Sequence, residues 1–219
     1  MTTHDEIVEL ARAEGLLAMG ALHPDRLAAK GVQGGTLILL GAGPGFWEVL
    51  RASPEMLDGR PNPVDRWSRR VIGALADSLR AVAHFPFGGP PYAPFIDWAI
   101  KSGRAFVSPT GMLVHDVVGL MISYRGALHL PDEIPLPDAP GASPCTSCAG
   151  KPCLTACPVG ALGETAPYDV AACHAYLDTA AGRDCLEREC RVRRSCPVSA
   201  GADRKPAQSA HHMKAFHPS

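Results

Sequence analysis

Eight cysteines lie in the last third of this 219-residue chain, and none lies in its first 144 residues. They are Cys145, Cys148, Cys153, Cys157, Cys173, Cys185, Cys190 and Cys196. Two of them, Cys157 and Cys196, are followed directly by proline. A segment this rich in glycine and cysteine loops cannot build a large apolar core by itself, so whatever its thiols bind constrains its fold.

The spacing of the thiols predicts two 4Fe–4S clusters. The first run reads C-x2-C-x4-C-x3-C-P from Cys145 to Cys157, two residues longer in its middle gap than the bacterial two-cluster run. The second group is Cys173 followed by C-x4-C-x5-C-P from Cys185 to Cys196. Each cluster needs four converging thiolates, and in two-cluster ferredoxins the fourth cysteine of a run ligates the other cluster.

This exchange of the fourth cysteine predicts two ligand sets, which we call set 1 and set 2. Set 1 consists of Cys145, Cys148, Cys153 and Cys196. Set 2 consists of Cys157, Cys173, Cys185 and Cys190. Because the x4 and x5 gaps lengthen the loops, individual cysteines could be exchanged between the two sets.

Disulfides, zinc and inert buried thiols are the alternatives to iron–sulfur clusters. A disulfide framework is typical of small secreted domains, but the segment after Met1 has neither a positive nor an apolar signal region. Zinc suits a C-x2-C pair but suits the Cys-Pro endings and the interleaved groups less well. Inert buried cysteines would not cluster in this way. The prediction is therefore iron–sulfur, with zinc as the main alternative.

The composition predicts a cytoplasmic protein with neither a membrane nor a nucleic-acid partner. The formal net charge is −1, and no apolar run approaches the roughly 20 residues of a spanning helix. The stretch from Arg183 to Lys205 holds seven basic and four acidic residues. We expect a solvated face that balances the anionic clusters, and a docking patch for an acidic electron donor is the alternative.

A proline-rich connector divides the chain. Residues 131–140 contain four prolines, which predicts an extended segment with neither helix nor central strand. The predicted domains are residues 1–137, without cysteine, and residues 138–219, which hold the clusters and a C-terminal tail. The three histidines of residues 209–219 are expected to lie in a frayed tail.

Helical and strand patterns alternate in the first domain. Thr3 and Glu6 form a capping box, followed by apolar residues at helical spacing over 7–18. The apolar run 36–40 predicts a strand buried on both faces. Asn62 as the N-cap and Pro63 as the first helical residue predict a helix, with an apolar stripe over 62–82.

Two further strands are predicted over 112–114 and 120–124, around a turn at 115–119, and 127–130 could extend the second strand. The sequence GAGPG at 41–45 follows a strand but lacks the third glycine of a dinucleotide loop, so it predicts a tight turn between strand and helix. Together these patterns predict a mixed α/β or α+β fold.

Four segments in the same order resemble the cobalamin-processing family of the cobalamin C type: TLILL at 36–40, NPVDRW at 62–67, VHDVVG at 114–119 and YRG at 124–126. The cysteine region, with CHAYL at 173–177, resembles the iron–sulfur half of epoxyqueuosine reductase and reductive dehalogenases. These resemblances imply an α+β, nitroreductase-like domain that cradles cobalamin, followed by a ferredoxin-like module with two 4Fe–4S clusters.

The first resemblance also implies a corrin pocket. His115 matches a turn histidine that lies near the corrin, and Arg125 matches an Arg-Gly strand. The loop 85–95 could wall a flat ligand with four aromatic side chains. They are Phe85, Phe87, Tyr92 and Phe95. Each position could equally have a structural role: a capped turn histidine, an arginine paired with a carboxylate such as Asp116, and a loop that covers the core.

The chain departs from these families at several points. The turn has Asp116 where the cobalamin C family has proline, and Val118 where that family has phenylalanine. The glutathione-handling part of that family has no counterpart here, and neither has the helical repeat region that helps epoxyqueuosine reductase to hold tRNA. These departures argue against tRNA as a substrate.

The expected function is the transfer of single electrons from two 4Fe–4S clusters to a bound corrinoid, as a cobalamin reductase or a cobalamin-dependent reductase of a small molecule. A protein electron donor is implied, and the catalytic residues are not identified. The chief alternative is a ferredoxin-type electron carrier whose first domain docks a partner enzyme. A third hypothesis is a bound flavin, although the N-terminal region lacks a basic-and-serine cluster for the flavin phosphate.

Overall fold

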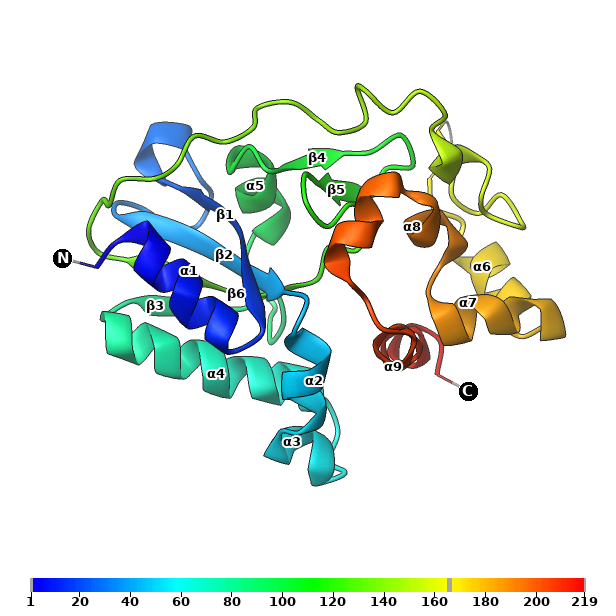
Figure 1. Ribbon diagram of the computed structural model, residues 1–219, viewed down its shortest axis with the longest axis horizontal. Helices are drawn as coiled ribbons and strands as arrows, with labels where there is room; N and C mark the ends of the chain where they lie inside the picture. The colour runs from blue at the N-terminus through cyan, green and yellow to red at the C-terminus, as the bar shows by residue number, and fades with distance from the viewer. Residues whose placement is uncertain (1, 165–166, 219) are drawn as a thin grey trace. The chain divides into compact units, whose positions relative to one another are not determined.

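The computed structural model describes residues 2–164 and 167–218. The chain divides into two compact units, and Figure 1 follows it through both. Unit 1 comprises Met1–Ala105 and Ser123–Gly141, and unit 2 comprises Phe106–Ile122 and Ala142–Ser219. The domain boundary expected near residue 137 lies close to Gly141, after which the chain passes from unit 1 into unit 2 for the last time. Residues 106–122 belong to unit 2, however, although the sequence places them in the first domain.

Unit 1 is built on a four-stranded antiparallel sheet in the order β1-β2-β6-β3. Its strands are β1 (Leu16–Leu22), β2 (Thr36–Ala42), β3 (Val82–His84) and β6 (Tyr124–Leu130). Its helices are α1 (His4–Ala13), η1 (Asp25–Leu27), α2 (Phe46–Arg51), α3 (Pro54–Leu57), α4 (Pro63–Leu79) and α5 (Phe95–Lys101). A separate two-stranded sheet pairs β4 (Ala105–Val107) with β5 (Leu113–His115), and all of its residues except Ala105 belong to unit 2. The predicted mixed helix-and-strand class is confirmed.

Strand β2 runs through the centre of unit 1, and all of its residues are buried. Ile38 and Leu40 pack into the core shared with α1 and α4, which Figure 1 shows beside the sheet. Trp67 of α4 is fully buried there, and its ring meets Phe46 edge-on at 5.1 Å between centroids. Leu37 and Leu39 alternate with these residues and are also buried. The predicted strand with two buried faces is therefore confirmed.

Helix α1 begins as expected but ends early. Thr3 and Glu6 form the predicted capping box. The helix stops at Ala13, and Gly15 has a φ of +74°. A Cβ on Gly15 would lie 2.9 Å from the Phe46 backbone, so glycine suits both the conformation and the space. Leu17 and Ala18, expected on the helix, belong to β1 instead.

Helix α4 has the predicted start but not the predicted cap. Pro63 is its first residue, whereas the side chain of Asn62 makes no capping hydrogen bond because Asn62 has a φ of +54°. Arg66 stabilises this start by donating to the carbonyl of Pro61 at 3.0 Å and to the carboxylate of Asp58 at 2.7 Å. The helix ends at Leu79, so position 82, expected on its apolar stripe, lies in β3 and is exposed.

The prediction of a strand over 120–124 is wrong for residues 120–123, and only Tyr124 lies in a strand. His115 and Gly119 form an antiparallel bridge that closes the predicted turn. Residues 120–123 then run without strand structure, and β6 begins at Tyr124. The segment 127–130, expected only to extend that strand, is the body of β6, which pairs with both β2 and β3.

The GAGPG segment is the tight turn that the sequence predicts. Strand β2 ends at Ala42 and α2 begins at Phe46. The Gly43 N–H donates to the carbonyl of Gly15 at 3.0 Å. A Cβ on Gly43 would lie 3.0 Å from that same oxygen, so glycine permits this close approach.

The connector 131–140 forms neither helix nor strand, as its prolines predict. The fully buried Thr36 fastens its beginning to the sheet. The Thr36 hydroxyl donates to the carbonyl of Asp132 at 2.9 Å and accepts from the N–H of Ile134 at 3.0 Å. Across residues 2–164 and 167–218, no helix has the length and apolar character needed to cross a membrane.

Replacing Thr36 by valine tests this attachment. Thr36→Val keeps the side-chain shape but leaves the buried Ile134 N–H without its acceptor, so we expect a loss of about 1–3 kcal/mol in the free energy of unfolding. Thr36→Ser keeps the hydroxyl and should lose less. Urea unfolding followed by circular dichroism measures both variants. A larger loss for Thr36→Ser than for Thr36→Val would contradict the role of the hydrogen bonds.

Candidate metal centre

The cysteines of unit 2 lie on or beside short helical elements. These elements are η2 (Pro152–Leu154), α6 (Val170–Leu177), η3 (Ala180–Gly182), α7 (Arg183–Arg188), α8 (Arg191–Ser195), η4 (Pro197–Ala202) and α9 (Pro206–Phe216). Cys190 directly precedes α8 and Cys196 directly follows it. One five-residue helix therefore joins a member of set 2 to a member of set 1.

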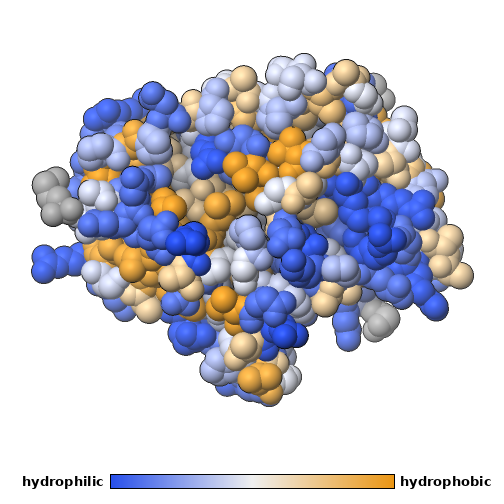
Figure 2. Space-filling view, viewed as in Figure 1, coloured by the Kyte–Doolittle hydropathy of each residue, from blue (hydrophilic) through white to orange (hydrophobic). Residues whose placement is uncertain are grey.

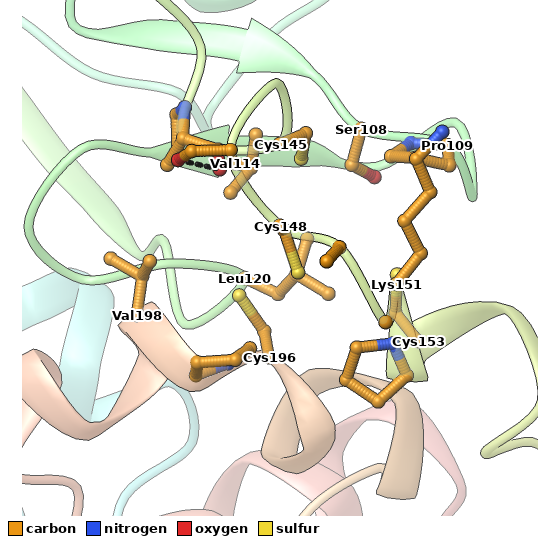
Figure 3. A pocket seen from close by; sticks show the side chains of 16 residues that line it. Ser108, Pro109, Val114, Leu120, Cys145, Cys148, Lys151, Cys153, Cys196 and Val198 are labelled. Carbon is orange, nitrogen blue, oxygen red and sulfur yellow. Dashed lines mark hydrogen bonds between the residues drawn. The ribbon is translucent and has the colours of Figure 1, made fainter.

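The four cysteines of set 1 surround one cavity of about 560 Å³. Figure 3 shows Cys145, Cys148, Cys153 and Cys196 around this space. Cys153 is the most deeply buried of the four, and burial raises the pKa of its thiol. Charge repulsion from Cys145, Cys196 and Cys148 raises it further.

Apolar side chains from three parts of unit 2 complete the surroundings of set 1. Val114 of β5 and Leu120 line the cavity and pack in one cluster with Cys153, Leu162 and Val192. This lining makes one side of the cavity apolar, beside the buried Cys153. The contribution of residues 106–122 could not be predicted, because the segment is remote in sequence and contains no cysteine.

Within set 2, Cys190 interacts electrostatically with both Cys185 and Cys173. Burial is the largest cause of the raised pKa of Cys190, and Cys185 adds to it by charge repulsion. Burial likewise raises the pKa of Cys173, where Cys190 and Cys157 add repulsion and a hydrogen bond with Tyr168 opposes it. Cys190 therefore lies near Cys185 and near Cys173, and Cys173 lies near Cys157.

Backbone N–H groups point at sulfur atoms in set 2. The N–H of Ala161 donates to Sγ of Cys157 at 3.3 Å. At the start of α8, the backbone N–H groups of Arg193 and Val192 act to lower the pKa of Cys190, against the larger effect of burial. Such donors stabilise thiolates, which are the form of cysteine that binds metals.

All eight cysteines are free thiols, so the structure contains none of the disulfides of the alternative framework. Over the described ranges 2–164 and 167–218, no three His, Cys, Asp or Glu side chains are placed to hold a single metal ion. The fit of set 1 to a cluster rests on the cavity, which four thiols and an apolar lining enclose. A four-iron cage occupies a volume and takes its ligands around that volume.

Hydrogen bonds tie the segment before residue 122 to the helices that carry the ligands. The Ser199 hydroxyl accepts from the N–H of Leu120 at 3.0 Å, and Arg193 donates to the Leu120 carbonyl at 3.2 Å. Arg204 donates to the carbonyl of Met121 at 2.8 Å. A Cβ on Gly119 would collide with the Ser199 backbone nitrogen, so glycine is required at this approach.

A buried ion pair lies beside Cys190. Arg204 and Glu189 are 3.2 Å apart, with only 7% and 5% of their side chains exposed. Glu189 has a φ of +80°, which is costly for a residue with a side chain. Its carbonyl also accepts from Nε of Arg194 at 3.0 Å. The two arginines thus hold a strained residue next to a candidate ligand.

The basic stretch 183–205 is balanced by internal ion pairs. Asp184 pairs with Arg188 at 3.7 Å and with Arg191 at 2.8 Å, and it also pairs with Arg194. On the face shown in Figure 2, hydrophilic side chains cover the part of unit 2 that contains α7 and α8. This agrees with the expected solvated face.

His115 lies in unit 2, at the end of β5, and is fully buried. Its Nδ1 is 3.1 Å from the N–H of Val117 and 2.9 Å from Oδ1 of Asp116. The ring therefore interacts with its own turn, as expected for a capped turn histidine.

Arg69 of α4 organises two of the four aromatic residues in the loop 85–95. Its guanidinium lies over the rings of Phe85 and Phe87, at 5.8 Å and 5.2 Å from their centroids. The two rings are 5.3 Å apart. Gly88 has a φ of +86°, and a Cβ there would lie 2.5 Å from the Arg69 guanidinium. This glycine lets the loop pass over Arg69.

The other residues of the expected pocket have different surroundings. Phe95 is buried against Trp98 of α5, whereas Tyr92 is 65% exposed. The guanidinium of Arg125 lies 3.9 Å from the carboxylate of Asp65. Burial raises the pKa of Asp65 and outweighs the opposing effects of Arg125 and Arg69. Phe85 and Phe87 contact Arg69 of α4, and Arg125 lies near Asp65 of the same helix, so these three residues lie beside α4. Phe95 and Tyr92 have the different surroundings given above.

No protein-family model matches the chain, and no curated protein matches it in sequence.

Breaking the buried ion pair should destabilise unit 2. Arg204→Met leaves the carboxylate of Glu189 buried without its partner, for which we expect a loss of about 3–5 kcal/mol. Arg188→Met removes an exposed partner of Asp184 and should cost less than about 0.5 kcal/mol. Chemical unfolding measures both. Equal effects of the two substitutions would show that burial of the pair has no special role.

Proposed function

We propose that this protein holds two 4Fe–4S clusters, one in set 1 and one in set 2, and uses them to pass single electrons. The observation that supports this most is the cavity of about 560 Å³ that the four thiols of set 1 surround. The linked thiols of set 2 supply the second group of four ligands. With this function we also propose a ferredoxin-like fold for unit 2.

The protein contributes binding, spacing and exclusion of water. The thiolates bind the clusters, and α8 keeps the two sets close, since the five helical residues between Cys190 and Cys196 rise only about 7.5 Å. Val114, Leu120 and Val192 keep the surroundings of set 1 apolar. When bound, such clusters accept and release one electron at a time.

For the electron acceptor we propose a corrinoid bound by unit 1, with a nitroreductase-like fold for that unit. Support comes from the resemblance of four ordered segments to the cobalamin C type family. The relation of Phe85, Phe87 and Arg125 through α4 adds to it. The product would be a reduced corrinoid, or a small molecule that the corrinoid reduces.

A plain electron carrier with a protein acceptor is the second candidate. It is favoured by the internal contacts of His115 with its own turn and by the core position of Phe95, because neither contact depends on a ligand. Unit 1 would then dock the acceptor. A flavin bound by unit 1 would show itself in the same binding experiments by its yellow colour.

Iron analysis tests the cluster assignment. We expect about eight irons per chain in protein reconstituted without oxygen, and about four in Cys196→Ser and in Cys190→Ser, since each variant loses one ligand set. Ser147→Ala, which changes a serine beside the set 1 cavity, should keep the full content. A chain that takes up zinc and no iron–sulfur cluster would refute the assignment.

An anaerobic titration with cobalamin, followed in the visible spectrum, tests the acceptor. We expect a base-off spectrum on binding and reduction below Co(III) by the dithionite-reduced, desalted protein. Arg125→Met and Phe87→Ala should weaken binding, and Arg80→Met, just beyond the end of α4, should not. An unchanged spectrum together with a co-purifying redox protein would favour the electron carrier.

A further inference from the structure

The turn 114–120 brings two buried residues to the set 1 cavity. Backbone hydrogen bonds of 2.9 Å and 3.0 Å join His115 and Gly119 in an antiparallel bridge. Val114 directly precedes this bridge, and Leu120 directly follows it. Both residues line the cavity, and only 1% and 2% of their surfaces are exposed. The turn that resembles part of a corrin site therefore places its flanking residues beside the cysteines.

Leu120 is held by hydrogen bonds at both of its backbone polar groups. Its N–H donates to Oγ of Ser199 at 3.0 Å, and its carbonyl accepts from Arg193 at 3.2 Å. Arg193 lies three residues before Cys196, and Ser199 lies three residues after it. The two side chains that fix Leu120 thus come from the helical elements on either side of a set 1 cysteine.

Glycine at position 119 permits the close approach of the turn to η4. Gly119 has a φ of +56°, and a Cβ there would lie 2.4 Å from the backbone nitrogen of Ser199 and 2.7 Å from its Oγ. Any side chain at position 119 would push the turn away from Ser199. Leu120, the next residue, would then move with it.

An apolar wall beside a cluster acts on the reduction potential of that cluster. Figure 3 shows Leu120 on the wall of the cavity, with the sulfur atoms of Cys148 and Cys196 around the same space. Reduction adds an electron to an assembly that four thiolates already make negative, and apolar surroundings disfavour the extra charge. The hydrophobic shell of a metal site controls the access of water and hence the potential. A shorter side chain at position 120 would leave room for water.

We propose that Leu120 lowers the reduction potential of the set 1 cluster by closing one side of its cavity, and that Ser199 is a positioning residue for Leu120. This inference rests on the proposed function, because it needs a cluster in set 1. It gives the cysteine-free turn 114–120 a place in the redox site.

Mediated titrations followed by electron paramagnetic resonance test the role of Leu120. Leu120→Ala should make the midpoint potential of the set 1 cluster less negative and leave that of the set 2 cluster unchanged, and Leu120→Val should give a smaller shift in the same direction. The set 1 signal is assigned from Cys190→Ser, which should keep only that cluster.

Leu162→Ala is the matched control for the titrations. Leu162 packs in the same apolar cluster as Leu120 but is not among the described residues that line the cavity. An unchanged set 1 potential in Leu120→Ala and Leu120→Val would overturn the proposal. An equal shift in Leu162→Ala would also overturn it, because the effect would then not depend on the cavity wall.

A double-substitution cycle tests the positioning of Leu120. Ser199→Ala removes the acceptor of the Leu120 N–H without a change of charge, and Gly119→Ala displaces the turn. Each should make the set 1 potential less negative, and neither should shift it further in a chain that already carries Leu120→Ala. Gly111→Ala is the control, since Gly111 has a φ of +77° but no heavy atom within 4 Å of an added Cβ. Effects that add to that of Leu120→Ala would overturn the positioning role.

Set 2 provides a control for thiol reactivity, because a different segment covers it. The sequence predicts a frayed C-terminal tail, but α9 runs from Pro206 to Phe216. Met213 of this helix packs in a small apolar cluster with Cys185. Cys185 is 6% exposed and Cys153 is 7% exposed, so the two thiols are matched in burial.

Alkylation of the full-length, cluster-free chain separates this inference from the proposed function. Iodoacetamide should modify Cys153 several-fold faster in Leu120→Ala than in the wild type, with the rate at Cys185 unchanged. Equal rates at Cys153 would overturn the covering role of Leu120 whatever the metal content. A wild-type chain that binds no iron would overturn the proposed function and the potential shift with it, and faster alkylation of Cys153 would still support the covering contact.

Discussion

Helix α8 has only five residues, with a set 2 cysteine before it and a set 1 cysteine after it, and unit 2 depends on this connection. Neither set is contiguous in sequence, so each group of four thiols forms only when the loop from Cys145 to Cys157 meets the helices that follow. As thiolates, these groups repel one another, and burial raises the free energy needed to hold their charges. Bound cations would remove that cost, which is why the fold of unit 2 and the proposed metal content belong together.

Hydrogen bonds and a buried ion pair around the cysteines add stability that the small apolar core of unit 2 does not supply. Arg193 and Arg204 bind backbone carbonyls of the inserted segment, and Ser199 accepts from its Leu120 N–H, so that segment is held against the ligand helices. The ion pair between Arg204 and Glu189 is buried, and such a pair loses stability when either partner is removed. Strain at Glu189 is thus maintained beside a candidate ligand by surrounding contacts.

Much of unit 1 could be predicted from local pattern. The capping box at Thr3, the buried run of β2 and the proline at the start of α4 act through neighbouring residues, and each was found where expected. The errors share a cause. Residues 17–18 and 120–123 are apolar enough for helix or strand, and the choice depended on Gly15 and on contacts with remote segments. Among the expected pocket residues, Phe85 and Phe87 share Arg69, a contact that no spacing rule predicts.

The sequence by itself determined that eight thiols would lie in one region, because cysteine spacing and Cys-Pro endings are local properties. It also determined the buried central strand and the proline connector. Only the tertiary structure decided that residues 106–122 would wall the set 1 cavity and that Phe216 and His217 would lie on the helix of Cys173. These contacts join segments tens of residues apart, and their geometry depends on how every intervening element packs.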